Sequence, residues 1–437
     1  MPRAIVASLL SIVLAGCGST PGPTAALVSA IPTGPPTASP TAIVAASLPP
    51  SSSPSPTTVD VLPGAFTTPI PPPAGSAWTT IHWHRLSATD PLALVHSVVP
   101  WPGGSIAVGV DRTSTTGSWT PLWRSSDGVT WKPLGQVFGA RTIVLGVAAI
   151  GTGLVALTAN GGNPSCPPWV CGSLAASVMA WTSSDGVSWF AHVGPDLALP
   201  QDASQPPMVT LAGGPGGLVA ASVPESGGAG TVATSLDGVT WVSLPADALP
   251  QDTALRDVHG TSGGFVAVAR TWPAGSSVTG SVALRSTDGR TWTSLPLRPV
   301  AVPRVGLVDR LFQGGSGFLA TGSDYGLPGT TLWWWSADGR SWRAVKGYPP
   351  IGTCPPYVCL GTEPAGDLGA DGTRIVAYRG GAAPAVWTSF DGRSWTRLVV
   401  VGAPLTLFQA GGNLVVLPGG VLVSDGISTW FGETSAR

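Results

Sequence analysis

A seven-residue pattern, Ser-x-Asp-Gly-x-Ser/Thr-Trp, recurs six times and limits the possible folds more than any other feature of the chain. The copies begin at Ser125, Ser183, Ser235, Ser286, Ser336 and Ser389, and their aspartates are Asp127, Asp185, Asp237, Asp288, Asp338 and Asp391. An altered seventh copy runs from Ser424 to Trp430. Successive aspartates are about 50 residues apart, which indicates a series of repeated structural units.

Each septet is predicted to be the tip of a β-hairpin. Asp-Gly is a turn pair, because glycine accepts a positive φ and the aspartate can bind backbone N–H groups just ahead of it. Apolar residues typical of strands flank the septets, for example Leu122-Trp123 before the first and Trp131 in its last position. A catalytic carboxylate is needed once or twice rather than six times. We therefore interpret the six aspartates as turn staples and assign no catalytic or metal-binding role to them.

A second marker precedes each septet: a glycine-rich tip followed by an apolar strand, such as Gly263-Gly264 before Phe265 to Val268. Each repeat thus holds two hairpins, or four strands. Four-stranded sheets repeated around an axis form a β-propeller. The sequence predicts an all-β fold with a propeller over residues 77–437, most simply of seven four-stranded blades, with six as the alternative.

The ends of the chain are expected to close the ring. Thr80 to Leu86 imitates the strand that follows a septet and is predicted to be the outer strand of the last blade, with the tail around Trp430 as a rival for that place. His82 and His84 fall on one face of this strand. Two histidines are a potential metal site, but an exposed edge strand is the preferred interpretation, so we predict no metal and no cofactor.

The septet resembles the Asp-box, or BNR repeat, of sialidase-like β-propellers, whose usual pattern has one more residue between Asp and Gly. The resemblance spans the chain from about residue 88 onward and implies the propeller fold. A sialidase-like enzyme would also need three arginines, a Tyr-Glu pair and an acidic aspartate. The Phe/Tyr-Arg-Ile-Pro motif of that family is absent here. Six charged residues could converge at the centre, although nothing in their spacing requires it: Arg256, Asp257, Arg304, Asp309, Arg310 and Arg374.

The N-terminus predicts export and lipid anchoring. A basic start is followed by an uncharged apolar run from Ala4 to Ala15, which is too short to span a bilayer and suits a signal peptide. The run ends in Leu-Ala-Gly-Cys and resembles a bacterial lipoprotein signal. We therefore expect residues 1–16 to be removed and Cys17 to carry the lipid, which places the protein outside the cytoplasm on the cell membrane. An ordinary secretory peptide is the alternative.

The other cysteines lie in two similar segments, Cys166 to Cys171 and Cys354 to Cys359, each containing Pro-Pro. Disulfides persist in exported proteins. The simplest pairing is within each segment. A zinc site formed by all four thiolates is the alternative, which the four-residue spacing and the oxidising compartment disfavour.

Composition separates the remaining regions. Residues 17–76 are rich in Pro, Ser and Thr after the lipidated cysteine and are predicted to be a disordered spacer. Over the whole chain, charged residues make up 10%, and no basic patch is present, so a nucleic acid partner is not expected. The sequence leaves the oligomeric state open.

Long connections are predicted to gather at one face of the propeller. In a four-stranded antiparallel blade, the glycine tips and septets share one face, while the second turn and the link to the next blade share the other. Binding residues concentrate in such loops. Candidate ligand-binding aromatics there are Trp169, Trp272, Tyr325 and Tyr357. The leading hypothesis is a membrane-anchored binding or scaffold module for a glycan or protein ligand, and the alternative is a divergent sialidase-like glycoside hydrolase or lyase.

Overall fold

The computed structural model describes the propeller region and leaves most connecting loops undescribed. The described residues are 64–70, 76–87, 89–109, 120–135, 137–139, 142–160, 177–199, 208–223, 230–245, 247–271, 280–297, 306–324, 331–345, 366–379, 384–402, 413–424 and 428–436. Within these ranges no helix is long and apolar enough to cross a membrane.

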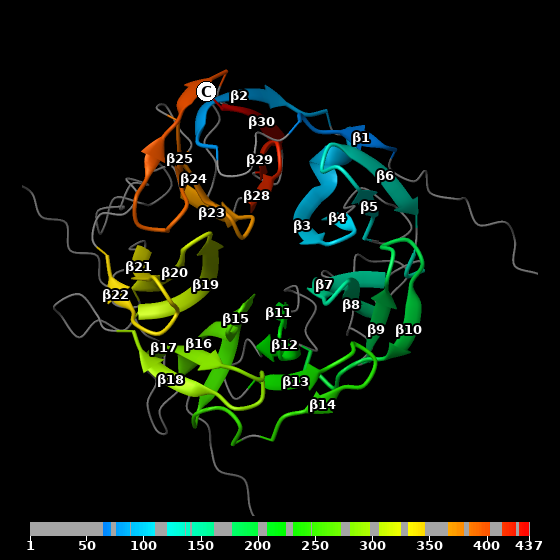
Figure 1. The fold of residues 1–437 in the computed structure, drawn as a ribbon, viewed down its shortest axis with the longest axis vertical. Helices are drawn as coiled ribbons and strands as arrows, with labels where there is room; N and C mark the ends of the chain where they lie inside the picture. Colours follow the sequence, from blue (N-terminus) through cyan, green and yellow to red (C-terminus); the bar gives the residue numbers. More distant parts are fainter. Residues whose placement is uncertain are drawn as a thin grey trace, which may run out of the picture. The chain divides into compact units, whose positions relative to one another are not determined.

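Seven four-stranded blades form a ring, as Figure 1 shows, so the prediction of a seven-bladed propeller is confirmed. Blade one holds β3 (Val95–Trp101), β4 (Gly104–Gly109), β5 (Leu122–Ser125) and β6 (Thr130–Gly135). Blade two holds β7 (Thr142–Ile150), β8 (Gly153–Asn160), β9 (Val178–Ser183) and β10 (Phe190–Val193). Blade three holds β11 (Met208–Gly214), β12 (Gly217–Val223), β13 (Thr231–Ser235) and β14 (Val242–Ser243). Blade four holds β15 (Thr253–Thr261), β16 (Gly264–Thr271), β17 (Gly280–Ser286) and β18 (Thr293–Pro296).

Blade five holds β19 (Gly306–Gly314), β20 (Gly317–Asp324), β21 (Thr331–Ser336) and β22 (Arg343–Ala344). Blade six holds β23 (Gly366–Ala370), β24 (Ile375–Arg379), β25 (Ala385–Ser389) and β26 (Thr396–Arg397). Blade seven combines β28 (Asn413–Leu417), β29 (Gly420–Ser424) and β30 (Thr429–Ala436) with β2 (Trp78–Arg85) from the start of the chain. A short 3₁₀ turn, η1 (Pro91–Leu94), precedes β3. The first strand of each blade lies nearest the axis (Figure 1).

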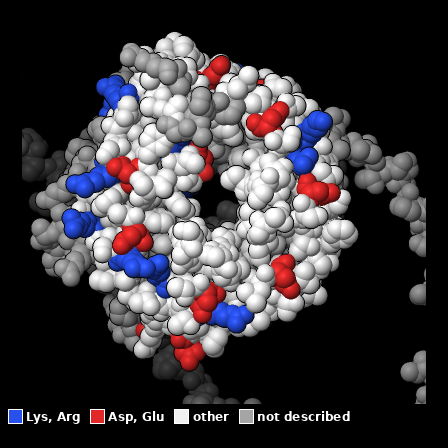
Figure 2. Space-filling model, in the orientation of Figure 1, with Lys and Arg blue, Asp and Glu red and all other residues white. Residues whose placement is uncertain are grey.

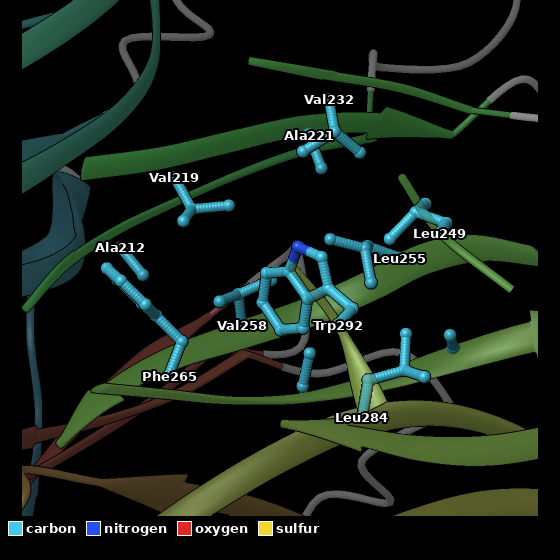
Figure 3. Packing of buried hydrophobic residues seen from close by; sticks show 12 residues of the cluster. Ala212, Val219, Ala221, Val232, Leu249, Leu255, Val258, Phe265, Leu284 and Trp292 are labelled. Atoms are coloured by element: carbon cyan, nitrogen blue, oxygen red, sulfur yellow. The ribbon is translucent and has the colours of Figure 1, made fainter. Parts of the chain in front are cut away.

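The hydrophobic core lies between adjacent blades rather than inside one of them. Between blades three and four, Val219 and Val232 face Leu255, Phe265 and other buried residues, as Figure 3 shows. The second strand of a blade is buried on both faces, and Phe265 to Ala269 are at most 1% exposed. This double burial explains why these strands are uninterrupted apolar runs.

The six septets join the third and fourth strands of blades one to six. In the first septet, Asp127 Oδ1 accepts the N–H groups of Val129 and Thr130 at 2.8 and 2.7 Å, and Ser125 Oγ accepts the N–H of Gly128 at 2.8 Å. The same bonds recur in the other five. The septet glycines have φ values from 69° to 77°, where a side chain is strained.

The septets also connect neighbouring blades, at the same end of the ring as the glycine tips. A Cβ on Gly238 of blade three would lie 2.3 Å from Val155 Cγ2 of blade two, and one on Gly216 would lie within 3.0 Å of the Asp288 backbone. The glycine is thus required both for the turn and for close packing between blades. The long connections emerge at the opposite end, as the strand order predicts.

The ring closes through β2, which pairs with β30 from Trp78↔Ala436 to Arg85↔Trp430. The prediction for Thr80 to Leu86 is confirmed, and the tail around Trp430 supplies the third strand of blade seven instead. His82 and His84 are exposed, as the exposed-edge interpretation expected, but β2 is not an edge strand, because β27 (Val399–Val401) pairs alongside it in parallel. Packing of Trp78, Ile81 and Trp83 against blade six holds the seam.

The altered septet has a different place from the one its sequence indicates. In blade seven, Leu414 to Val416 belongs to the first strand rather than the second, and Ser424 to Trp430 connects the second and third strands. The reason is the closure by β2: because the start of the chain provides the fourth strand, the C-terminal segment supplies only three.

A segment of the predicted spacer belongs to the propeller. In β1 (Phe66–Thr67), Phe66 pairs with Trp131 of β6 and stacks on its ring at 5.6 Å between centroids. Thr68 Oγ1 donates to Gly128 O at 2.8 Å and accepts from Trp131 Nε1 at 3.3 Å. Residues 64–70 therefore cover the edge of blade one. The stacking of Phe66 and the hydrogen bonds of Thr68 hold them there, although the surrounding residues are rich in proline.

Candidate functional site at the ring axis

The innermost strands surround a hollow that Figure 2 shows at the centre of the ring. Pairing between the first and second strands puts one residue of each blade at an equivalent height. These residues are Ser97, Gly146, Thr210, Asp257, Arg310, Asp367 and Asn413. Six of the seven are polar and the other is glycine, although the rest of these strands is largely apolar. The polar residues therefore form a layer half-way along the axis.

Bulges modify this layer in blades one, two, four and five. In each of them the pairing register of the inner strand with the second strand skips one residue, which is His96, Leu145, Arg256 or Asp309. A bulge redirects the side chain of the extra residue. In blades four and five it brings Arg256 and Asp309 to within 3.9 Å of each other.

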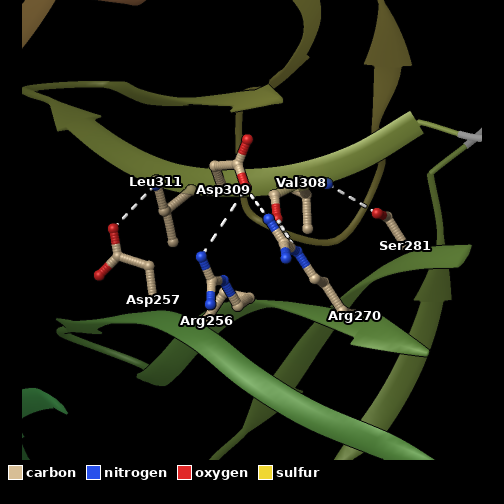
Figure 4. Close-up of polar contacts among 7 residues, drawn as sticks. All are labelled: Arg256, Asp257, Arg270, Ser281, Val308, Asp309 and Leu311. Carbon is tan, nitrogen blue, oxygen red and sulfur yellow. Dashed lines mark hydrogen bonds and ion pairs between the residues drawn. The ribbon is translucent and has the colours of Figure 1, made fainter. Parts of the chain in front are cut away.

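Asp309 is held by two arginines of the neighbouring blade, as Figure 4 shows. Arg270 Nη2 donates to Asp309 Oδ1, and Arg270 Nε donates to the carbonyl oxygen of Val308 at 3.4 Å. The Arg256 side chain is only 9% exposed. Burying a guanidinium is costly unless a carboxylate compensates for its charge, so Asp309 is committed to this pairing.

Asp257 binds the backbones of two blades. Its Oδ2 accepts the Leu311 N–H of blade five at 2.9 Å, and its Oδ1 accepts the Val258 N–H at 3.0 Å (Figure 4 shows the Leu311 contact). Thr210 of blade three donates to Oδ1 at 3.5 Å, and His259 Nε2 lies 3.9 Å from Oδ2. Both carboxylate oxygens therefore brace blades three to five.

Arg310 and Asp367 form a third pair, across blades five and six, with Arg310 Nη1 3.4 Å from Asp367 Oδ1. The Arg310 guanidinium lies 5.2 Å from the Phe312 ring centroid, and half of the side chain is exposed. Burial raises the pKa of Asp367 to about 6, and the charge of Arg310 opposes that shift only in part. Asp367 Oδ2 is buried without a hydrogen bond of ordinary length.

The structure brings together four of the six charged residues named from the sequence. Arg256, Asp257, Asp309 and Arg310 meet at the axis, while Arg374 lies at a glycine-tip position of blade six, 4.1 Å from the Trp78 ring. Arg304 lies outside the described residues. The sequence reasoning missed Arg270 and Asp367. Aligning the repeats on their glycine tips would have placed Asp367 level with Asp257 and Arg310.

The predicted ligand-binding and cysteine residues fall in the undescribed loops. These are Trp169, Trp272, Tyr325 and Tyr357, together with Cys166, Cys171, Cys354, Cys359 and, near the N-terminus, Cys17. The described strands on either side show where the four loops attach: between β8 and β9, β16 and β17, β20 and β21, and β22 and β23. All four connections leave the end of the ring opposite the septets. Within the described ranges, no three His, Cys, Asp or Glu side chains gather as metal ligands.

Comparison with known proteins finds similarity of fold only. No protein-family model matches the chain, and no curated protein matches its sequence. Among solved structures, a Hadza microbial sialidase matches at 14% identity and a TM-score of 0.36, over 66% of this chain and 65% of its own, so the match spans less than two thirds of that enzyme. A protein of unknown function from Dyadobacter fermentans matches at 12% identity and a TM-score of 0.38, over 86% of this chain and all of its own. A fucose-specific lectin from Aleuria aurantia matches at 10% identity and a TM-score of 0.35, over 77% of this chain and 99% of its own. Similarity at this level assigns no activity.

Proposed function

We propose that this protein is a binding module, held outside the cytoplasm by a lipid on Cys17, that takes a glycan or protein ligand on its long-loop face. One observation supports binding rather than hydrolysis. The carboxylates of Asp257 and Asp309 at the axis are committed to backbone N–H groups and arginines of neighbouring blades. Glycoside hydrolysis needs two carboxylates that act together on one bond.

The described residues at the axis instead form a braced platform in which Arg310 is an accessible cation. Arg310 is half exposed, and Asp367 and Phe312 hold its guanidinium in place. A preordered polar group of this kind suits recognition of hydroxyl and carbonyl oxygens. In this proposal Trp169, Trp272, Tyr325 and Tyr357 supply the stacking surfaces. The pairs Cys166–Cys171 and Cys354–Cys359 close two of the loops as separate disulfides.

One observation favours the alternative, a divergent sialidase-like glycoside hydrolase or lyase. Asp367 has a pKa raised to about 6 and one uncommitted carboxylate oxygen. A general acid needs a proton near neutral pH. In this alternative Asp367 is the proton donor.

A glycan array combined with a glycosidase screen distinguishes the two functions. We expect the full chain to bind a subset of glycans without cleaving them, and Trp169→Ala or Tyr357→Ala to lower the affinity at least tenfold. Val399→Ser, on the outer side of blade seven, is the matched control and should bind normally. Cleavage that is lost in Asp367→Asn would instead establish the enzyme. Palmitate labelling of the wild type against Cys17→Ser tests the anchor.

A further inference from the structure

Exposed apolar side chains gather on two neighbouring blades. Ten large apolar residues are exposed in the described parts of the chain, and six of them belong to blades two and three. These six, which we call the rim patch, are Val187, Phe190, Val193, Leu236, Val239 and Val242, with exposed fractions from 43% to 84%. They lie on two septets and on the outer strands β10 and β14. Patches of this kind on a soluble surface mark interaction sites.

The fold does not require apolar residues at these positions. The fifth septet residue and the residue after the septet are Val187 and Phe190 in blade two, and the same two positions in blade five are Arg340 and Arg343. All four side chains are exposed. Because equivalent backbone positions accept arginine, packing of the propeller does not explain the rim patch.

The contact between the two blades makes the patch continuous. A Cβ on Gly238, which lies between Leu236 and Val239, would be 3.2 Å from Thr182 Cγ2 of blade two. Thr182 in turn pairs with Phe190 across β9 and β10. The septet of blade three therefore lies against β9, the direct neighbour of the strand that carries Phe190.

Within the described parts of blades two and three, the charge has one sign, and Arg290 of blade four is a basic residue beside Val242. The described residues of blades two and three contain no lysine or arginine, and their acidic residues are Asp185, Asp196 and Asp237. Backbone N–H groups of Ser188 and Val187 lower the pKa of Asp185 to about 2, so that it stays ionised. Each of blades four, five and six, in contrast, contains arginine. In Figure 2 basic side chains lie over β17 to β25 and none lies over β9 and β10.

Within the described residues, the outer strands of these blades have open edges. β10 and β14 are the last strands of their sheets, whereas β1 covers β6 in blade one and β27 covers β2 in blade seven. An open edge presents unpaired N–H and C=O groups that can pair with another extended segment. This chain already uses that mode of pairing twice.

A cleft of about 700 Å³ adjoins the patch at the boundary of blades three and four. Val242 forms part of its wall, together with Leu244, Leu249 and Trp292. Asp247 and Arg290 supply the charged groups of the lining. The volume and lining suit a large apolar side chain, with Arg290 available to a backbone carbonyl oxygen.

We propose that the rim patch and this cleft bind an extended segment of a partner protein in which apolar and basic residues alternate. The segment adds a strand at the edges of β10 and β14, places an apolar side chain in the cleft and sets its basic side chains against the acidic sector. This surface lies on the septets and outer strands of blades two and three, and its cleft extends to Asp247 and Leu249 in the link between blades three and four. It contains none of the four aromatic residues of the proposed ligand face, so we treat it as a second binding surface.

The test uses the full chain and labelled decapeptides of alternating apolar and lysine residues, followed by fluorescence anisotropy. We expect saturable binding that weakens with salt, and no binding of the matched peptides with glutamate in place of lysine. Phe190→Ser combined with Val242→Ser should weaken binding at least tenfold. Val399→Ser combined with Val401→Ser, which removes equally exposed side chains from β27, should change it less than twofold.

Three results would overturn the proposal. The first is that no lysine peptide binds saturably, and the second is that the glutamate peptides bind equally well. The third is a concentration-dependent dimer in sedimentation that the Phe190 and Val242 substitutions abolish, because the patch then serves a second copy of the chain. Melting curves of each variant establish that it is folded, and glycan binding should stay unchanged in all of them.

Discussion

At the residue scale, serine rather than aspartate satisfies the glycine N–H of each septet, a donor that is buried in blades two to six. In blade four, Ser286 Oγ accepts the buried Gly289 N–H at 2.8 Å, while Asp288 binds the Arg290 and Thr291 N–H groups where water also reaches them. Only a buried donor that loses its acceptor carries the full cost of desolvation. This difference between the two side chains explains why a serine hydroxyl is present in every septet.

This difference predicts unequal effects of two substitutions. Ser286→Ala should lower the free energy of unfolding by about 1–3 kcal/mol, and Asp288→Ala by about 1 kcal/mol or less. Urea denaturation of both variants checks the order. A larger loss for Asp288→Ala would mean that its carboxylate, and not the hydroxyl, dominates the turn.

Asp367 should make the protein less stable as the pH rises. Its folded pKa of about 6 lies above the value near 4 of an unfolded aspartate, so between these values the folded state binds the extra proton. The contribution of Asp367 to stability is therefore greatest below about pH 4 and is lost as the pH rises through about 6.

Asp367→Asn removes this penalty. At pH 7 the variant should be more stable than the wild type by about 2 kcal/mol, and near pH 4 the two should be equal. Urea denaturation at both pH values measures the difference, with Asp196→Asn on an exposed site as the control. Equal stability at pH 7 would show that Arg310 fully compensates for the buried charge.

At the element scale, β1 substitutes for a bond that other blades make within themselves. In blades three, four and five the septet tryptophan donates its indole N–H to the septet glycine carbonyl, as Trp292 does to Gly289 O at 3.0 Å. In blade one Thr68 stands between Trp131 and Gly128 and bonds to both. Phe66 covers the exposed side of the same tryptophan.

Two truncations test the contribution of β1. A chain that begins at residue 64 should melt like the full chain, because it retains every described residue. A chain that begins at residue 76 should lose about 2–3 kcal/mol, the contribution of burying one phenylalanine, and its tryptophan fluorescence should shift to the red. Identical melting of the two chains would contradict a stabilising role for β1.

At the scale of the whole molecule, stability and charge are distributed around the ring in different ways. Hydrophobic clusters fill all seven boundaries between blades, and β2 joins the first part of the chain to the last. Among the described residues, a charged and polar network braces the axis from Thr210 in blade three to Asp367 in blade six. The rim patch lies on the septets and outer strands of blades two and three, outside this network. A repeated scaffold thus supports two chemically different sides.

The sequence by itself determined the repeat and the hairpin at each septet, because turn chemistry and apolar periodicity are local properties of the chain. It predicted seven blades closed by Thr80 to Leu86 but left six blades and closure by the tail around Trp430 as alternatives, and the pairing of β2 with β30 decided between them. Only the tertiary structure decided that β1 belongs to blade one, that the altered septet connects the second and third strands, and that Asp257, Asp309 and Asp367 face partners in other blades. Those contacts join residues about 40 to 60 positions apart, and no local pattern encodes which strand of the next blade lies opposite. Close packing between blades fixes these pairings, because burial makes each charge require a partner.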